Sequence, residues 1–269
     1  MINSINLSNA IRKNVLRMCH LGGSSHVASC LSMADIVACT YLNMKKCPTE
    51  PNWSERDYFI LSKGHAGATI YATLAELGYF DVARLEKHYQ NGSTMSGHVS
   101  HVDNPGVEFS TGSLGHGLPV CSGIAKSFKL DRRKNKVFCV ISDGELGEGS
   151  NWEAILFSSH HKLDNLTVLV DRNRLQSLKD TEETLALEPL DDKLIAFGWN
   201  VIVVDGHNHS AITDAIISPP NGKPKIIICN TIKGKGVSFM ENQVPWHYKS
   251  PNEQELTMAL NELCSTELT

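Results

Sequence analysis

Two short stretches of this sequence carry oxygen ligands in a spacing that suits a metal ion and a diphosphate. Asp143-Gly144 opens the glycine-rich run 143–149, and Asn173 follows 30 positions later. That is the length of one strand-helix-strand crossover, so both side chains would emerge at one sheet edge if the two strands are neighbours. Carboxylate and amide oxygens suit Mg²⁺ or Ca²⁺, glycines let the backbone approach a diphosphate, and amides at a helix start near Glu148 favour the anion. Taken separately, Asp143-Gly144 is also typical of a turn, and Asn173 of a strand-end cap.

Histidine is the second chemical signal, because the chain has 12 of them and several stand beside glycine in expected loops. Imidazole changes its charge near neutral pH and suits proton transfer and phosphate contact. A lone histidine is more often a surface or core residue, but several together at strand ends favour a shared site. The histidines concerned are His26, His65, His98, His116 and His247.

The apolar pattern predicts the elements that position these residues. Five Val/Ile/Leu-rich runs of strand length alternate with longer helical patterns such as 66–77 and 148–161. Continuous rather than alternating apolar runs are typical of strands covered on both faces, so the pattern predicts an α/β fold with a doubly wound parallel sheet and helices on both faces. Ligands of such sheets bind beyond the carboxyl ends of the strands. Helical patterns precede the first strand, and the stretch 91–117 is expected to be a long functional loop. The expected strands are 57–62, 136–142, 166–171, 199–204 and 225–230.

Composition excludes some classes of function. A net charge of -4 and 41% hydrophobic residues in 269 are ordinary for a globular protein and give no electrostatic reason to expect nucleic acid. No apolar run approaches the roughly 18 residues of a membrane span, and the N-terminus lacks the features of a signal peptide. The eight scattered cysteines form no Cys-x-x-Cys pair, so we expect buried free thiols and a cytoplasmic protein rather than disulfides or a zinc site.

The run 143–154, Asp-Gly-Glu-Leu-Gly-Glu-Gly-Ser-Asn-Trp-Glu-Ala, together with Asn173, resembles the thiamine-diphosphate signature of transketolases. The resemblance extends over about residues 7–263. It implies that 1–269 form a single thiamine-diphosphate-binding domain of the diphosphate type. It also implies transfer of a two-carbon ketol unit from a ketose phosphate to an aldose, with thiamine diphosphate and Mg²⁺ (or Ca²⁺) as cofactors.

The same resemblance assigns roles to individual residues. Glu148 and Glu153 resemble acidic residues that link two active sites across a dimer. The implied metal ligands are Asp143, Asn173 and the backbone carbonyl of Leu175. The implied catalytic histidines are His26, His65, His98 and His247. The implied cofactor contacts are His65, Gly112, Leu114, Gly144, Glu148, Glu153, Asn173 and His247.

Three departures from the family pattern stand out. Ser142 replaces the glycine that usually precedes the metal-binding aspartate. Val27-Ala28 follow His26 where Pro-Gly is usual, and Tyr248 follows the last histidine where a glycine is common. We expect the second and third departures to lie near the substrate channel. They therefore predict an unusual substrate, other than ordinary xylulose and ribose phosphates, with the cofactor chemistry retained.

The resemblance also implies a partner. Complete transketolases carry a further domain that binds the aminopyrimidine ring of the cofactor and supplies a glutamate to it. Residue 269 falls where the first domain of the family ends, so we expect a split transketolase in which a C-terminal subunit with the pyrimidine-binding domain joins this chain in an α2β2 assembly. A truncated piece of a longer chain is the alternative.

Three other functions stay open at this point. The chain resembles, less closely, a deoxyxylulose-phosphate synthase-like enzyme or a 2-oxoacid dehydrogenase α subunit, although the segment 231–242 is more similar to split transketolases. A non-catalytic cofactor-binding subunit is the second alternative, suggested by Val27-Ala28. A Mg²⁺-dependent phosphohydrolase using Asp143 is the third alternative, but such an enzyme does not require an asparagine 30 positions after the aspartate, where Asn173 stands.

Overall fold

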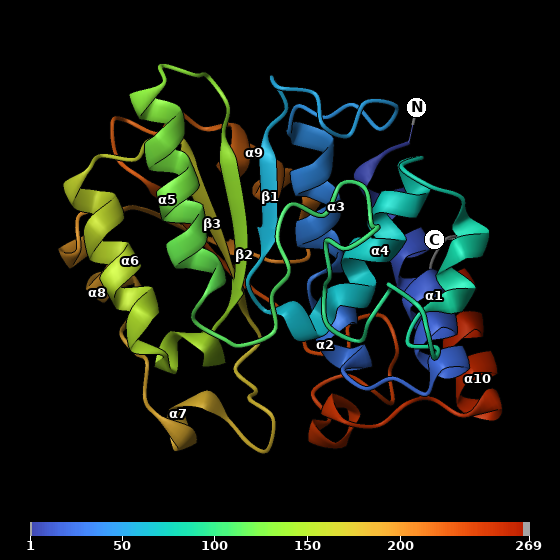
Figure 1. Cartoon of the computed structure of the whole chain (residues 1–269). Helices are drawn as coiled ribbons and strands as arrows, with labels where there is room; N and C mark the ends of the chain where they lie inside the picture. The colour runs from blue at the N-terminus through green and yellow to red at the C-terminus, as the bar shows by residue number, and fades with distance from the viewer. Residues whose placement is uncertain (1, 266–269) are drawn as a thin grey trace.

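Five parallel strands form a sheet at the centre of the computed structural model, which describes residues 2–265 (Figure 1). Their order across the sheet is β1-β2-β3-β5-β4. β2 and β3 pair directly, with Ser142 opposite Asp171 at their carboxyl ends. The prediction that the second and third strands are neighbours is therefore confirmed. The strands are β1 (Tyr58–Leu61), β2 (Val137–Ser142), β3 (Leu166–Arg172), β4 (Asn200–Asp205) and β5 (Lys225–Asn230).

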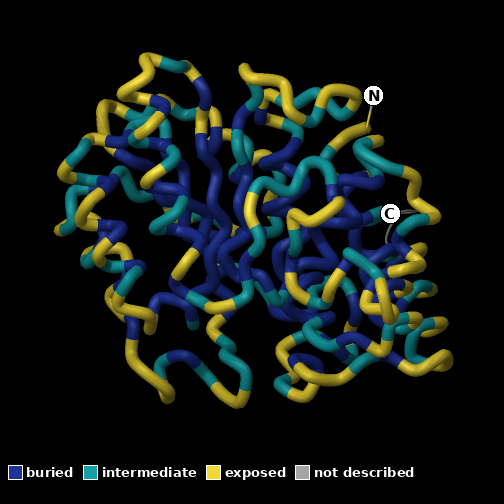
Figure 2. The backbone as a smooth tube through the Cα atoms, in the orientation of Figure 1, coloured by how far each residue is buried: buried dark blue, intermediate teal, exposed yellow. Residues whose placement is uncertain are grey.

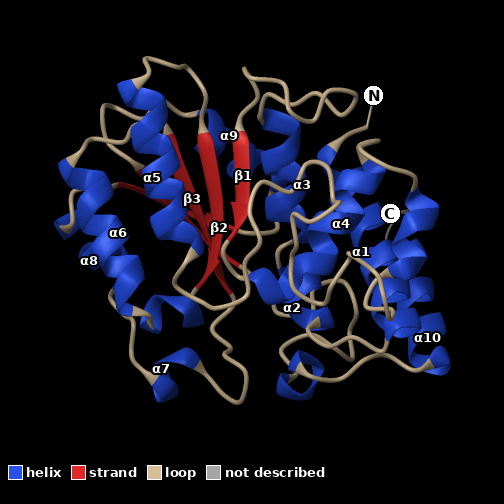
Figure 3. Cartoon of the chain, viewed as in Figure 1, coloured by secondary structure: helices blue, strands red, loops and turns tan. Residues whose placement is uncertain are grey.

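Helices α5, α6 and α8 cover one face of the sheet, on the left in Figure 3. Leu118, Ile155 and Leu194 from these helices pack against inward-facing strand residues such as Ile141 and Val168, and all five are buried. Burial of apolar side chains between layers is what holds the helices to the sheet. The bounds are α5 (Gly117–Leu130), α6 (Gly149–His160) and α8 (Leu190–Ala196).

A second and larger group of helices covers the opposite face. Ile11 from α1 and Ile70 from α4 belong to a core cluster that also takes in Leu169 of β3. α1 begins after Asn3, whose side chain caps the first turn, and it ends at Gly23, where a left-handed φ of 61° stops the helix. This layer comprises α1 (Ser4–Gly22), α2 (Val27–Ser32), α3 (Ala34–Asn43), α4 (Gly67–Glu76), α9 (His209–Ile217) and α10 (Glu253–Ser265).

The segment between the last residues of η2 and the start of α5 is irregular. Residues 91–116 contain no helix or strand, so the long loop expected over 91–117 is confirmed. The remaining short elements are the 3₁₀ helices η1 (Gly64–Ala66), η2 (Val82–Lys87), η3 (Gly144–Gly147) and η4 (Val244–His247), and the one-turn helix α7 (Thr181–Thr184).

The strands differ in how far they are buried, as the dark centre of Figure 2 shows. Every residue of β2 and β3 is buried, as continuous apolar runs predict. β4 lies at the sheet edge, and Val203 in it is 51% exposed. All five strand predictions agree with the structure to within one residue at each end, but complete coverage of both faces is wrong for β4.

Two expectations drawn from composition concern the membrane and the cysteines. Within residues 2–265, no helix has the length and apolar character that crossing a bilayer requires. All eight cysteines are free thiols, and all but Cys47 and Cys264 are buried. The prediction of buried free thiols therefore holds for six of them.

Candidate functional site

A cavity of about 280 Å³ opens where the carboxyl ends of the strands meet. The loops that follow β1, β2, β3 and β5 all contribute side chains to its wall, together with α2 and η4. The position agrees with the rule that ligands of parallel sheets bind at this edge. The wall consists of His26, Ser29, Lys63, His65, His98, Gly112, Leu114, Ser142, Asp143, Gly144, Asn173, Leu175, Gln176, Ser177, Lys233, His247 and Tyr248.

Most of the residues expected from the sequence therefore converge on one cavity. Glu148 and Glu153 are the exceptions, because both are exposed and neither lines the wall. The start of α6 beside Glu148 likewise lies outside the wall. His116 is exposed and also lies outside the cavity. The linking role of the two glutamates concerns an assembly and stays a prediction.

Asp143 sits at the tip of β2 and is almost fully buried, with 1% exposure. Its carboxylate accepts hydrogen bonds from the backbone amides of Gly144 (2.7 Å) and Arg174 (2.6 Å) and from the Arg172 guanidinium (3.1 Å). Burial, and then the nearby charge of Asp171, raise its pKa in spite of these contacts. The cation beside this carboxylate is the Arg172 guanidinium, and the metal-ligand role expected for Asp143 stays a prediction.

Asn173 and Leu175 lie beside Asp143 on the loop after β3. The Asn173 amide oxygen accepts from the Leu175 amide (3.1 Å), and its nitrogen donates to Asp171 (3.1 Å). These bonds orient the amide oxygen on the loop. The Leu175 carbonyl faces the cavity and accepts from the Lys233 ammonium (3.0 Å). Within the described part of the chain, no three His, Cys, Asp or Glu side chains form a metal cluster, so a metal here would depend on amide and backbone oxygens as well as Asp143.

Two buried lysines supply positive charge to the cavity, and the sequence analysis identified neither. Lys63 forms an ion pair with Asp171 (2.5 Å), and that pairing, together with hydrogen bonds, keeps the pKa of Asp171 below its usual range although burial opposes ionisation. Lys233 donates to the carbonyls of Leu175 and Gln176 and lies 3.1 Å from His247 Nδ1. Burial, and then the charge of Lys63, lower the pKa of Lys233 to about 8. The only sequence signal was the presence of lysine just after a strand.

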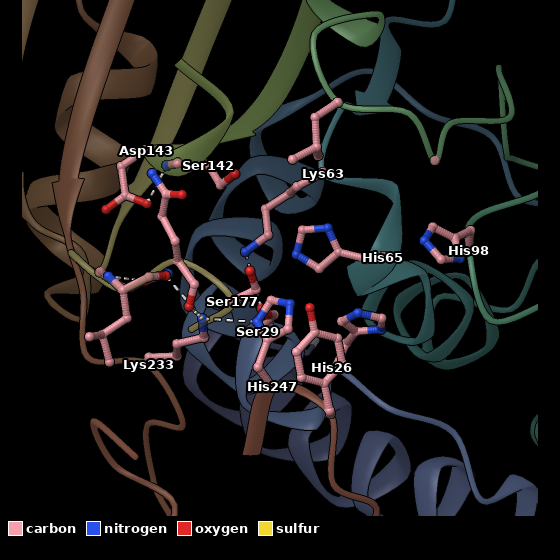
Figure 4. A pocket seen from close by; sticks show the side chains of 17 residues that line it. His26, Ser29, Lys63, His65, His98, Ser142, Asp143, Ser177, Lys233 and His247 are labelled. Carbon is pink, nitrogen blue, oxygen red and sulfur yellow. Dashed lines mark hydrogen bonds between the residues drawn. The ribbon is translucent and has the colours of Figure 1, made fainter. Parts of the chain in front are cut away.

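Four imidazoles form a continuous group on the other side of the cavity (Figure 4). The ring of His26 lies 5.1 Å from that of His65, 5.8 Å from His98 and 4.9 Å from His247. His26 itself has a left-handed φ of 72°, which is uncommon for any residue other than glycine. In Figure 4, Asp143 lies on the opposite side, with Lys63 between.

Three of these imidazoles are held in the neutral form. Burial is the largest cause in each case, followed by neighbouring rings and the lysines. The pKa of His26 falls to about 4, that of His247 falls to about 3, and that of His65 falls well below the usual range. At neutral pH they therefore act as hydrogen-bond donors and acceptors that carry no charge.

Two glycines after β1 explain how His98 reaches this group. A Cβ on Gly64 would lie 2.4 Å from the Thr111 carbonyl oxygen, and one on Gly67 would lie 2.6 Å from the Val99 backbone nitrogen. The long loop that carries His98 thus packs directly against η1 and the start of α4. Larger residues at these two positions would push the loop away.

Glu145 is a buried residue that the sequence analysis missed. It accepts from the Ser62 hydroxyl, from the Gly115 amide (2.9 Å) and from the Ser142 amide (3.3 Å), while its own amide donates to the Ser142 hydroxyl (3.3 Å). This is a reciprocal capping pair across Ser142-x-x-Glu145, a pattern that can be read from a sequence. The serine that replaces the family glycine therefore has a local partner.

The other two departures from the family pattern, Val27-Ala28 and Tyr248, lie in different environments. Val27 and Ala28 are fully buried in the core and do not line the cavity themselves, although they lie between the wall residues His26 and Ser29. Apolar residues at the start of α2 pack against neighbouring helices instead. The expectation that they lie near the substrate channel stays a prediction. Tyr248 does line the cavity, with its ring 4.8 Å from His247 and 6.0 Å from His26. Tyr248 therefore changes the wall, as Ser142 also does.

Comparison with known proteins agrees with this geometry. The family described as transketolase, thiamine diphosphate binding domain, matches residues 4–264. The chain belongs to the transketolase family. It is 41% identical over 254 residues to an apulose-4-phosphate transketolase subunit of Actinobacillus succinogenes, and the match covers 94% of this chain and 92% of that protein. It is 39% identical to the 6-deoxy-6-sulfo-D-fructose transketolase subunit SqwG of a Clostridium species, over 95% and 94% of the two chains.

Longer transketolases match over part of their length. Human transketolase is 34% identical over 96% of this chain, which corresponds to 41% of the human protein. The solved transketolase of Campylobacter jejuni superposes with a TM-score of 0.89 at 29% identity, over 97% of this chain and 42% of that one. This transketolase-family chain thus has the fold of the N-terminal part of the longer transketolases. Its length is close to that of the relatives that are named as transketolase subunits.

Proposed function

We propose that this chain is the thiamine-diphosphate-binding subunit of a heteromeric transketolase, with residues 1–269 as a single domain of the diphosphate type. The partner would be a C-terminal subunit with the pyrimidine-binding domain, in an α2β2 assembly in the cytoplasm. The reaction is transfer of a two-carbon ketol unit from a ketose phosphate to an aldose. Relatives of nearly the same length that are called transketolase subunits support the need for a partner.

The single observation that carries the proposal is the composition of the cavity wall. One side presents Asp143, Asn173 and the Leu175 carbonyl, and the other presents four imidazoles. Among the described residues, the wall carries only Lys63, Asp143 and Lys233 as carboxylate or ammonium groups, and Lys63 is already paired with Asp171. A diphosphate therefore lacks a full counter-charge, and a divalent cation bound by hard oxygen ligands would supply it. The donor set fits Mg²⁺, and Ca²⁺ is the alternative.

The residues of this chain have separable roles in the proposed reaction. Asp143, Asn173 and the Leu175 carbonyl would hold the metal, and Lys233 would offset charge on the diphosphate. Thiamine diphosphate, when bound, would supply the carbanion chemistry that ketol transfer requires. The imidazoles of His26 and His98 can accept and return protons of substrate hydroxyls, because a neutral imidazole has one donor and one acceptor nitrogen. His65 and His247 stand between these two and the lysines and would orient the cofactor.

The test is to combine this chain with its candidate partner and to measure both cofactor binding and ketol transfer. We expect turnover of a ketose phosphate with an aldose acceptor only when both chains, thiamine diphosphate and Mg²⁺ are present. Asp143→Ala should abolish cofactor retention and turnover together. His26→Ala should retain the cofactor but lower kcat by roughly 10²-fold or more, as removal of a general acid or base does. Unchanged turnover in both variants would refute the proposal, and turnover of pyruvate alone would favour the other thiamine-diphosphate enzymes.

A further inference from the structure

The segment 231–236 after β5 places Lys233 in the cavity. Contacts outside the cavity hold this segment, and one of them is the bond from the Asn242 amide to the Lys233 carbonyl (2.8 Å). The Thr231 hydroxyl bonds to Asp171, and the Gly234 amide donates to the Ala28 carbonyl (3.0 Å). The Ile232 amide donates to His207 Nε2 (2.8 Å), and the Lys235 carbonyl accepts from Arg12 Nε (3.1 Å). Two of these contacts, those of His207 and Arg12, come from side chains that meet at one carboxylate.

That carboxylate is Asp35 on α3, which is 4% exposed. It accepts both terminal nitrogens of Arg12 (2.6 and 2.8 Å) and contacts His207 Nδ1 (2.8 Å) and His209 Nε2 (3.1 Å). The charge of Arg12 and these hydrogen bonds hold the pKa of Asp35 well below its usual range, although burial opposes ionisation. Asp35 is therefore held in its ionised form, and it contacts side chains from α1, the loop after β4 and α9.

The two contacts of His207 fix its tautomer. Nε2 accepts from a backbone amide, so the proton must be on Nδ1, where it is donated to Asp35. Asp205 accepts from the His207 backbone amide (2.9 Å) and holds the loop from the other side. His207 does not line the cavity, yet the residue whose amide it binds is the immediate neighbour of Lys233.

We propose that His207, oriented by Asp35, is a positioning residue that sets the place of the Lys233 ammonium in the cofactor cavity. The inference rests on the proposed function, because the place of Lys233 matters for activity only if the cavity holds the diphosphate. Asp205 is the last residue of β4, and His207 follows it in the loop after that strand. The bond from His207 to the Ile232 amide gives the histidine a further role, since it connects the buried Asp35 cluster with the cavity wall.

Two substitutions separate the two contacts of His207. In His207→Asn the side-chain amide nitrogen can occupy the place of Nδ1 and keep the bond to Asp35, but nothing reaches the Ile232 amide. In His207→Gln the longer side chain can place its oxygen where Nε2 lies, so the Ile232 contact is kept and the Asp35 contact is lost. Each variant loses one hydrogen bond, so their thermal unfolding midpoints should fall by similar amounts.

The experiment measures hydrogen exchange of the 231–236 backbone amides in the full chain, and thiamine-diphosphate affinity by calorimetry with Mg²⁺ in the assembled complex. We expect His207→Asn to speed exchange of the Ile232 amide at least tenfold and to weaken cofactor affinity about tenfold, the effect of one lost hydrogen bond. For His207→Gln we expect both the Ile232 exchange rate and the cofactor affinity to stay within about threefold of the wild-type values. The KM for the ketose should change less than the cofactor affinity.

Two results would overturn the inference. One is Ile232 exchange in His207→Asn equal to that of the wild type. The other is an equal loss of cofactor affinity in both variants, because that loss would follow stability rather than the Ile232 contact. The exchange measurement needs no cofactor. It therefore tests whether His207 holds the 231–236 segment even if the wild-type complex binds no thiamine diphosphate. Absence of binding by the wild type would instead refute the proposed function.

Discussion

The phenol ring of Tyr248 is the larger of two departures from the family pattern that line the cavity, and Ser142 is the other. Tyr248 lies against His247 and His26 and is 59% exposed, and its hydroxyl makes no hydrogen bond within the described part of the chain. The ring narrows the cavity beside these two histidines. We therefore expect selectivity among substrates to depend on Tyr248 more than on Val27 and Ala28, which are core residues.

We expect Tyr248→Gly to improve the use of ordinary ketose phosphates such as xylulose 5-phosphate. Removing the ring opens the entrance and should lower the KM for these donors at least tenfold, a typical discrimination for one group in a pocket. The kcat should change little, because the four histidines remain. Tyr248→Phe is the control, since it keeps the ring and should retain the wild-type preference. Steady-state kinetics with a panel of ketose donors checks this. KM values in Tyr248→Gly equal to those of the wild type would contradict the prediction.

His88 provides a test of acid sensitivity away from the cavity. It is 1% exposed, its Nε2 lies 3.1 Å from the Ser24 hydroxyl, and its Nδ1 has no partner. Burial lowers its pKa to about 4. The unfolded chain binds this proton near pH 6.5 and the folded chain only near pH 4, so the unfolded state takes up more protons in that window. The free energy of unfolding must therefore fall as the pH decreases from about 6.5 towards 4.

The pH dependence predicts the behaviour of His88→Phe, which cannot bind the proton. Between about pH 6.5 and 4, its unfolding free energy should fall less steeply than that of the wild type by up to ~1.4 kcal/mol per pH unit, the value for one proton. Above pH 7.5 the two proteins should differ by a constant amount. Urea denaturation at a series of pH values measures this. If the unfolding free energies of the two proteins depend on pH in the same way over the whole range, His88 is not the cause of the acid sensitivity.

At the scale of elements, the capping pair Ser142–Glu145 couples β2, η3 and the loop before α5. Ser142→Gly restores the family glycine and should lower the free energy of unfolding by about 1 kcal/mol, since one cap contact is lost. Glu145→Ala should cost roughly 3 kcal/mol, because Ser62 and Gly115 also lose their acceptor. In the double variant the Ser142 effect should largely disappear, as expected for residues in contact. Fully additive losses in chemical denaturation would argue against the pair.

The strands and their order of appearance were predictable because they consist of uninterrupted apolar runs between glycine-rich loops. The chemistry at their ends was also predictable, since Asp143 and Asn173 lie one crossover apart and β2 and β3 are neighbours. The roles of Lys233 and Asp171 were not predictable from the sequence. Lys233 bonds to Leu175, 58 positions away, and Asp171 pairs with Lys63, 108 positions away. The exposed side of β4 was missed for a related reason. Its sequence is as apolar as that of β5, and only the order of strands in the sheet decides which of them lies at the edge.

For the whole molecule, the predicted linking role of Glu148 and Glu153 depends on a surface that a partner would cover. Glu153 lies on α6 three and four residues before Leu156 and Phe157, so the three share a helix face. All three are exposed, Leu156 at 60% and Phe157 at 40%. Exposed apolar side chains beside an acidic residue that is expected to link two sites indicate an assembly surface. This face lies on the opposite side of the sheet from α9.

We therefore expect Leu156→Asp to weaken assembly while the chain itself stays folded. A charge in the middle of a buried interface should raise the dissociation constant of the complex at least tenfold, whereas an exposed site in the separate chain changes unfolding by less than about 0.5 kcal/mol. Ile217→Asp is the matched control, because Ile217 is 61% exposed and lies at the end of α9 on the other face. Sedimentation of each variant with and without the partner chain measures the effect. If both variants assemble like the wild type, α6 is not an assembly surface, and if both fail equally, the interface extends to the α9 face as well.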